Sequence, residues 1–155
     1  MPRFSNLKPN VMNEQENNFS FFRFEDLRIY AKALDYISWV HNITESMPGS
    51  CRNTVADAFV KSAQGIALNI AEGSARNKAQ FVYYLKMAKS SVRECVVYTE
   101  IASRVGVVND EDREYSRSQL MELTKMIGSL VASLQRNVSA REDEIGDDDM
   151  PNMMI

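Results

Sequence analysis

Apolar residues recur three or four positions apart along four stretches of this 155-residue chain, which is the spacing of one face of an α-helix. The pattern predicts helices over residues 25–46, 53–72, 77–105 and 109–137. No stretch has the strict apolar and polar alternation that is typical of a strand. Four helices joined by short loops predict an all-α fold, an up-down-up-down antiparallel four-helix bundle.

Asparagine and glycine mark several of the expected helix ends. Asn77 and Asn109 suit the N-caps of the third and fourth helices, because an asparagine side chain accepts a hydrogen bond from a free backbone N–H. Gly106 is expected to stop the third helix. Gly73 is expected to close the second helix by taking the left-handed conformation.

The first two helices differ in how their apolar residues are distributed. The second helix is apolar on most sides, which predicts that it is buried on most sides. The first helix has one apolar seam, which we expect to face the core. The seam consists of Leu27, Tyr30, Ala31, Leu34, Ile37, Ser38 and either Val40 or His41.

The third helix separates into three sectors at about 100° per residue. The sector expected to face the core holds Phe81, Tyr84, Leu85, Ala88, Val92, Cys95, Thr99 and Ala102. A basic sector holds Lys78, Lys86, Lys89, Arg93 and Arg104, with Glu100 as its one acidic residue. An apolar third sector, outside the core stripe, holds Tyr83, Met87, Tyr98 and Ile101.

Each of the two sectors outside the core has a functional and a plainer interpretation. The basic sector is either a strip that contacts the phosphates of a nucleic acid or a solvated helix face. The apolar third sector is either a subunit interface or an edge of the bundle that a loop or the N-terminal arm covers. Repeated around a symmetric oligomer, the basic sector would form a broad basic belt.

Composition divides the chain into three parts. Residues 1–20, rich in Asn, Pro and Ser, are expected to form a flexible arm. Residues 21–138 form the bundle and carry a net charge of about +2. Residues 139–155, with Arg141 against six carboxylates, are expected to be an acidic disordered tail of net charge −5. The low pI of 5.3 therefore does not exclude a nucleic-acid partner, because the tail dominates it. Four phenylalanines stand near the end of the arm: Phe19, Phe21, Phe22 and Phe24.

Residues that carry catalysis or bind metal ions are sparse. His41 is the single histidine and has no evident partner. Cys51 and Cys95 lack the paired spacing of a metal site, which favours two reduced thiols. We find no phosphate-binding, metal-binding or nucleophile motif. The sequence thus predicts a non-enzyme with no catalytic residue, no metal and no cofactor.

The chain has no apolar run of the roughly 20 residues that a membrane-spanning helix needs. Its first residues also lack the apolar segment of a signal peptide. We therefore expect a cytoplasmic protein without a membrane partner.

Three segments of the chain, residues 24–31, 69–76 and 81–94, resemble the four helix bundle protein family. Its members include proteins encoded by intervening sequences within large-subunit ribosomal RNA genes. The resemblance implies a bundle that assembles into a barrel-like homopentamer. In a related branch, the accessory variability protein of diversity-generating retroelements, it implies a basic barrel that binds nucleic acid and contacts a reverse transcriptase.

The family segment around residues 69–76 contains four residues that we interpret as structural: Asn69, Glu72, Gly73 and Arg76. Glu72 is expected to pair with Arg76 or with a basic residue on an adjacent helix. Asn69 is expected to bond backbone groups at a neighbouring helix end. An enzyme that uses Glu72 and Arg76 is a further hypothesis.

Together these patterns predict a non-catalytic oligomeric accessory protein. We expect it to bind RNA, DNA or both through a basic surface, and to assist a reverse transcriptase or an rRNA-associated process. The alternative is a protein-interaction scaffold with no nucleic-acid role, in which the apolar sector and the phenylalanines bind another protein.

Overall fold

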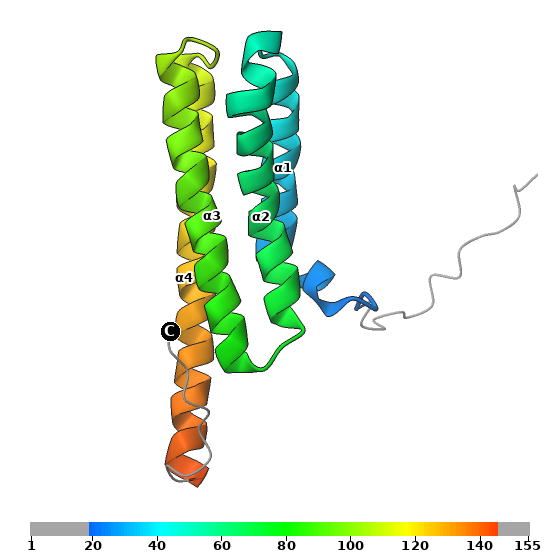
Figure 1. Cartoon of the computed structure of the whole chain (residues 1–155). Coiled ribbons are helices and arrows are strands. Elements are labelled where there is room, and N and C mark those ends of the chain that lie inside the picture. Colours follow the sequence, from blue (N-terminus) through cyan, green and yellow to red (C-terminus); the bar gives the residue numbers. More distant parts are fainter. Residues whose placement is uncertain (1–18, 146–155) are drawn as a thin grey trace, which may run out of the picture.

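The computed structural model describes residues 19–145, and the side chains of residues 19–136. Four long helices follow one another, and consecutive helices pack side by side in antiparallel order (Figure 1). They are α1 (Arg28–Glu45), α2 (Asp57–Ser74), α3 (Lys78–Arg104) and α4 (Asp110–Ile145). Residues 19–145 contain no strand. The all-α antiparallel four-helix bundle predicted from the sequence is confirmed.

α1 begins at Arg28 and α2 at Asp57, later than the starts predicted near residues 25 and 53, and short helical turns precede both. A 3-10 turn, η1 (Arg23–Asp26), precedes α1, and Leu27 separates the two in an extended conformation. A 3-10 turn, η2 (Gly49–Cys51), and a π-helical segment, η3 (Arg52–Ala56), lead directly into α2. The helical backbone therefore resumes earlier than residue 53, because the turn after Pro48 is itself helical.

Both asparagine caps and one of the two glycine stops are confirmed. The Oδ1 of Asn77 accepts a hydrogen bond from the N–H of Gln80 at 2.9 Å, and that of Asn109 accepts one from the N–H of Asp112 at 2.7 Å. Gly106 ends α3 with a φ of 78°. Gly73 does not have a positive φ; it lies inside α2, one residue before the helix ends.

Gly73 is needed where α2 and α3 approach each other closely. A Cβ at position 73 would lie 2.5 Å from the Cβ of Tyr84 and 2.9 Å from the Cδ2 of Phe81. Both contacts are shorter than van der Waals distance, so only a hydrogen atom fits on this side of the α2 backbone. Gly73 thus sets the helix spacing at the corner where α2 turns into α3.

The core lies among all four helices, and α1 enters it on a different seam from the predicted one. The buried residues of α1 are Ile29, Ala33, Tyr36, Val40 and Thr44. Leu34, which we expected in the seam, is 41% exposed, whereas Leu27, Tyr30 and Ile37 pack at the margin of the core. In α3, Val82 is fully buried although it was not among the predicted core residues. Phe81 and Tyr84, which were, are half-buried and lie beside Gly73 of α2.

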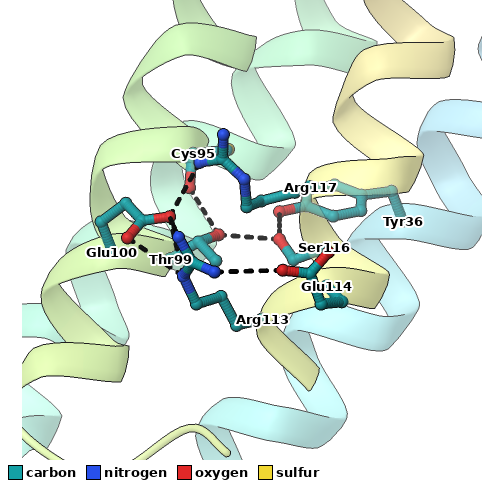
Figure 2. A network of polar contacts seen from close by, with 8 residues as sticks. All are labelled: Tyr36, Cys95, Thr99, Glu100, Arg113, Glu114, Ser116 and Arg117. Atoms are coloured by element: carbon teal, nitrogen blue, oxygen red, sulfur yellow. Dashed lines mark hydrogen bonds and ion pairs between the residues drawn. The ribbon is translucent and has the colours of Figure 1, made fainter. Parts of the chain in front are cut away.

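A row of buried hydroxyl groups crosses this core and joins three helices (Figure 2). The Oη of Tyr36 on α1 and the Oγ of Ser116 on α4 are 2.8 Å apart. Ser116 also lies 2.7 Å from the Oγ1 of Thr99 on α3, which donates to the carbonyl oxygen of Cys95 at 2.8 Å. Each hydroxyl finds a partner inside the protein, so the row fixes how the three helices slide relative to one another.

Stability is expected to fall in alkaline solution because two acidic groups of the core resist ionisation. Burial raises the pKa of the Cys95 thiol from 9.0 to about 12 and also raises the pKa of Tyr36. Above about pH 9 the unfolded chain therefore loses the Cys95 proton while the folded chain keeps it. The free energy of unfolding should then decrease by about 1.4 kcal/mol per pH unit for this group, with Tyr36 adding to the loss at higher pH.

Denaturant titrations from neutral pH to about pH 11 measure this decrease directly. Cys95→Ala is the control, because it removes the thiol and should make the pH dependence shallower in the lower part of the range. Equal pH dependence in both proteins would contradict the contribution of Cys95.

The helical bundle extends further toward the C-terminus than the sequence predicted. α4 continues to Ile145, so residues 139–145 of the predicted tail are helical, and the last turns of α4 project past the corner between α2 and α3 (Figure 1). The rest of the tail and residues 1–18 of the predicted arm lie outside the described residues. Phe24 packs edge-on against Tyr30, whereas Phe19, Phe21 and Phe22 are largely exposed.

Candidate functional site

The basic sector of α3, which we call the basic strip, lies along one side of the bundle. Its members are Lys78, Lys86, Lys89, Arg93 and Arg104. Lys86, Arg93 and Arg104 are exposed, and Lys78 and Lys89 are half-buried. None of the five forms an ion pair with a carboxylate of residues 19–136. Arg93 donates to the hydroxyl of Ser90 at 3.2 Å, so the charges of the strip are free to meet a ligand.

Glu100, the one acidic residue of this sector, is neutralised by two arginines of α4. Its Oε1 lies 3.0 Å from Nη2 of Arg113 and 2.8 Å from Nη1 of Arg117 (Figure 2). The hydrogen bond from Arg113, together with the charges of both arginines, lowers the pKa of Glu100. Glu100 therefore interrupts the basic strip less than the sequence suggested.

Arg113 and Arg117 were missed as partners of Glu100 by the sequence analysis. Their spacing of four residues places both on one side of α4, which was a usable signal. What the sequence did not give was the pairing of that side of α4 with the Glu100 side of α3. The same contacts show that the basic strip borders α4 rather than α2, since Arg93 lies seven residues, about two turns, before Glu100.

The apolar third sector of α3 lies further round the helix than the basic strip, away from α4. Tyr83, Met87 and Ile101 are 47%, 42% and 38% exposed, and we call these three residues the apolar edge. Tyr98, which we had grouped with them, is half-buried and stacks on Phe59 of α2 with ring centroids 6.1 Å apart. Tyr98 is therefore packed against another helix within one chain. Of the apolar edge, Tyr83 contacts the ring of the adjacent Tyr84, with centroids 5.5 Å apart, and all three side chains stay exposed.

The family segment at the end of α2 is organised by contacts within its own helix and with α3. Arg76 donates to Glu72 at 2.6 Å, and its guanidinium lies 5.4 Å from the ring centroid of Tyr84. Asn69 donates to the carbonyl oxygen of Gly65 in the preceding turn of α2, and not to a neighbouring helix end. With Gly73 packed against α3, these contacts form a helix corner, and they bring no nucleophile or proton-transfer pair together.

Comparison with protein-family models places most of this chain in a known family. Residues 25–129 match the model described as 23S rRNA-intervening sequence protein. The chain belongs to this family. Its segments 69–76 and 81–94, which carried the resemblance, lie within the matched range, together with all five members of the basic strip.

Among solved structures, the family member resembles a protein of unknown function from the S23 ribosomal protein family of Bacteroides thetaiotaomicron. The two chains are 19% identical and superpose with a TM-score of 0.63. The match covers 67% of this chain and 95% of the other. At this identity the likeness shows the shared fold. No functionally curated protein matches the sequence.

The single histidine of this family member lies away from the basic strip, between α1 and α2. Nε2 of His41 is 3.1 Å from Oε1 of Gln64. Both residues line an open hollow of about 380 Å³ together with Glu45, Arg52, Asp57 and Lys61. Charges of both signs balance in this hollow, which distinguishes it from the basic strip. Over the described part of the chain, no three His, Cys, Asp or Glu residues are grouped as metal ligands.

None of the helices of this family member within the described residues is both long enough and apolar enough to cross a bilayer.

Proposed function

We propose that this family member is a non-catalytic accessory protein that binds nucleic acid through the basic strip of α3. The observation that carries the proposal is a row of lysines and arginines, three exposed and two half-buried, without ion-pair partners among residues 19–136. Glu100, the one carboxylate of this sector, pairs with Arg113 and Arg117 of α4 and not with the strip. The positive charges of the strip are therefore not compensated by it. Phosphate groups are the ligands that a free row of this kind attracts most strongly.

The experiment is a fluorescence anisotropy titration with structured RNA, single-stranded RNA and duplex DNA across a salt series. The test variant replaces Lys86, Lys89 and Arg93 with alanine. We expect the affinity to fall by roughly tenfold or more. The slope of log affinity against log salt should become shallower by up to about 3, because about one counterion fewer is released on binding for each phosphate contact that is lost.

A matched control replaces Arg52 and Lys61 with alanine, since these basic residues lie in the charge-balanced hollow between α1 and α2. This control should bind as the wild type does. Absence of binding at low salt by the wild-type protein would reject the proposal.

We also propose that the protein is a homo-oligomer assembled through the apolar edge. Three exposed apolar side chains on one edge are typical of a surface that a partner covers. Replacing Met87 and Ile101 with glutamate should shift the mass measured by light scattering toward that of the 17.6 kDa chain. The pentameric state and contact with a reverse transcriptase stay predictions from the resemblance. A wild-type monomer would reject assembly.

The second candidate function is a protein-interaction scaffold without a nucleic-acid role. It is favoured by the same apolar edge and by Phe21, which is 92% exposed at the start of the described chain. The salt-dependent titration separates the two functions, because a scaffold predicts no binding to any of the nucleic acids.

A further inference from the structure

The fold brings together two stretches of sequence that contain lysine and arginine but no carboxylate. Residues 78–93 of α3 carry Lys78, Lys86, Lys89 and Arg93, and residues 123–136 of α4 carry Lys125 and Arg136. We call Lys125 and Arg136 the α4 row; both are exposed. Neither forms an ion pair with a carboxylate in the part of the chain whose side chains are described.

The contact between Thr99 and Ser116 sets the level at which the two stretches lie. In antiparallel helices, a residue that lies a given number of positions before the contact on one helix is at about the same height as the residue that lies the same number of positions after the contact on the other. Ser90 lies nine residues before Thr99, and Lys125 lies nine residues after Ser116. By the same count Arg136 lies level with the residue after Lys78. The α4 row thus runs beside the basic strip over nearly its whole acid-free length.

The orientation of α4 places its row toward solvent, between the side of the helix that faces α3 and the side that faces α1. Arg117 faces α3, since it bonds Glu100. At about 100° per residue, Lys125 and Arg136 lie about a quarter turn further round α4 than Arg117. Glu122, which pairs with Lys32 of α1 at 2.9 Å, lies about 40–60° beyond the α4 row, so the row faces solvent between the α3 side and the α1 side of the helix.

The carboxylates nearest to this surface already have partners. Glu94, which follows the acid-free stretch of α3, accepts a hydrogen bond from Ser62 of α2 at 2.7 Å. Glu122, which precedes the stretch of α4, is bound to Lys32. The surface therefore consists of two basic rows with neutral residues between them, including Met121, Thr124 and Gly128.

We infer that the basic strip and the α4 row together form a two-helix surface that binds the phosphate backbone of a nucleic-acid double helix. This inference rests on the proposed function and names its ligand class. Packed helix axes are about 8–10 Å apart, and long side chains extend the separation of their charges. The major groove of B-DNA is about 12 Å wide, so the two rows of phosphates that flank it match this spacing. A single strand supplies one row of phosphates.

The kinds of side chain on the surface also favour a duplex over a single strand. Proteins that bind single strands stack bases on exposed aromatic rings. The two acid-free stretches offer one exposed aromatic residue, Tyr83, and it belongs to the apolar edge. Lysine and arginine contacts to phosphates carry no sequence information, so binding should depend on duplex structure and not on base sequence.

The test compares duplex DNA, duplex RNA and an unstructured single strand that contain the same number of phosphates. The α4 variant replaces Lys125 and Arg136 with alanine. The charge-matched control replaces Arg52 and Lys61, and circular dichroism and light scattering check that all proteins fold and assemble alike. The DNA and RNA duplexes distinguish which double helix is preferred.

We expect the α4 variant to bind its preferred duplex roughly tenfold more weakly, with a salt slope shallower by about 2, and to bind the single strand as the wild type does. The control should leave both affinities unchanged. Equal wild-type affinity for the single strand and the duplexes would overturn the inference, and so would an unchanged duplex affinity in the α4 variant. Either result leaves the proposed function standing if the α3 variant still weakens binding.

Discussion

Replacing Gly73 with alanine is expected to lower the free energy of unfolding by about 2 kcal/mol or more. The added Cβ would lie 2.5 Å from the Cβ of Tyr84, an atom fixed to the α3 backbone, so a side-chain rotation cannot relieve the clash. α2 and α3 would have to separate at their shared corner. Alanine's better helix propensity offsets little of this loss, because Gly73 lies next to the last residue of α2.

Gly128→Ala is the matched control for this prediction. Gly128 lies inside α4, and a Cβ built there meets no atom within 4 Å. The same substitution should therefore raise the free energy of unfolding by about 0.5–1 kcal/mol, because alanine loses less backbone entropy in a helix. Urea denaturation followed by circular dichroism measures both values. If Gly73→Ala were as stable as the wild type, the close approach of α2 and α3 would be contradicted.

Replacing Ser116 with alanine is expected to lower the free energy of unfolding by about 2 kcal/mol. The substitution removes the hydroxyl that lies between Tyr36 and Thr99 in the core. Thr99 keeps its hydrogen bond to the carbonyl oxygen of Cys95. Tyr36 is 1% exposed, and its buried hydroxyl would lose the partner that lies 2.8 Å away, which is the costly part of the change.

A double-mutant cycle separates this cost from the loss of a contact alone. Tyr36→Phe removes the hydroxyl that loses its partner in Ser116→Ala. The double variant should therefore be destabilised by less than the sum of the two single variants, with a coupling of about 1 kcal/mol. Strictly additive effects in denaturant titrations would mean that the two hydroxyls do not depend on each other.

Several features of the helix ends were predictable because their causes are local. The Asn77 and Asn109 caps bond backbone groups three residues further along the chain, and Gly106 takes a conformation that glycine adopts readily. Gly73 was misinterpreted because the sequence cannot distinguish a glycine needed for its backbone conformation from one needed for close packing. The second requirement comes from Tyr84, on another helix.

The seam of α1 shows the same limit. Its buried residues and the predicted ones both follow helical spacing, and they differ by a rotation of the helix about its axis. Nothing in the α1 sequence states that Tyr36 must reach Ser116. That contact, eighty residues away along the chain, selects which of the available apolar stripes faces the core.

The candidate site was predicted in part for a comparable reason. The basic strip lies on one helix, so its spacing could be found from the sequence alone. The pairing of Glu100 with Arg113 and Arg117, and the position of Lys125 and Arg136 beside the strip, involve two helices. The placement of Tyr98 against Phe59 does so as well.

The sequence by itself thus determined the number of helices, their class, several of their ends and the sorting of charge around α3. These properties follow from backbone geometry and from the periodicity of apolar residues over a few turns. The tertiary structure alone decided the rotation of α1, the role of Gly73 and the joining of two acid-free stretches on α3 and α4. These depend on which helix faces meet, and packing among distant residues determines that choice.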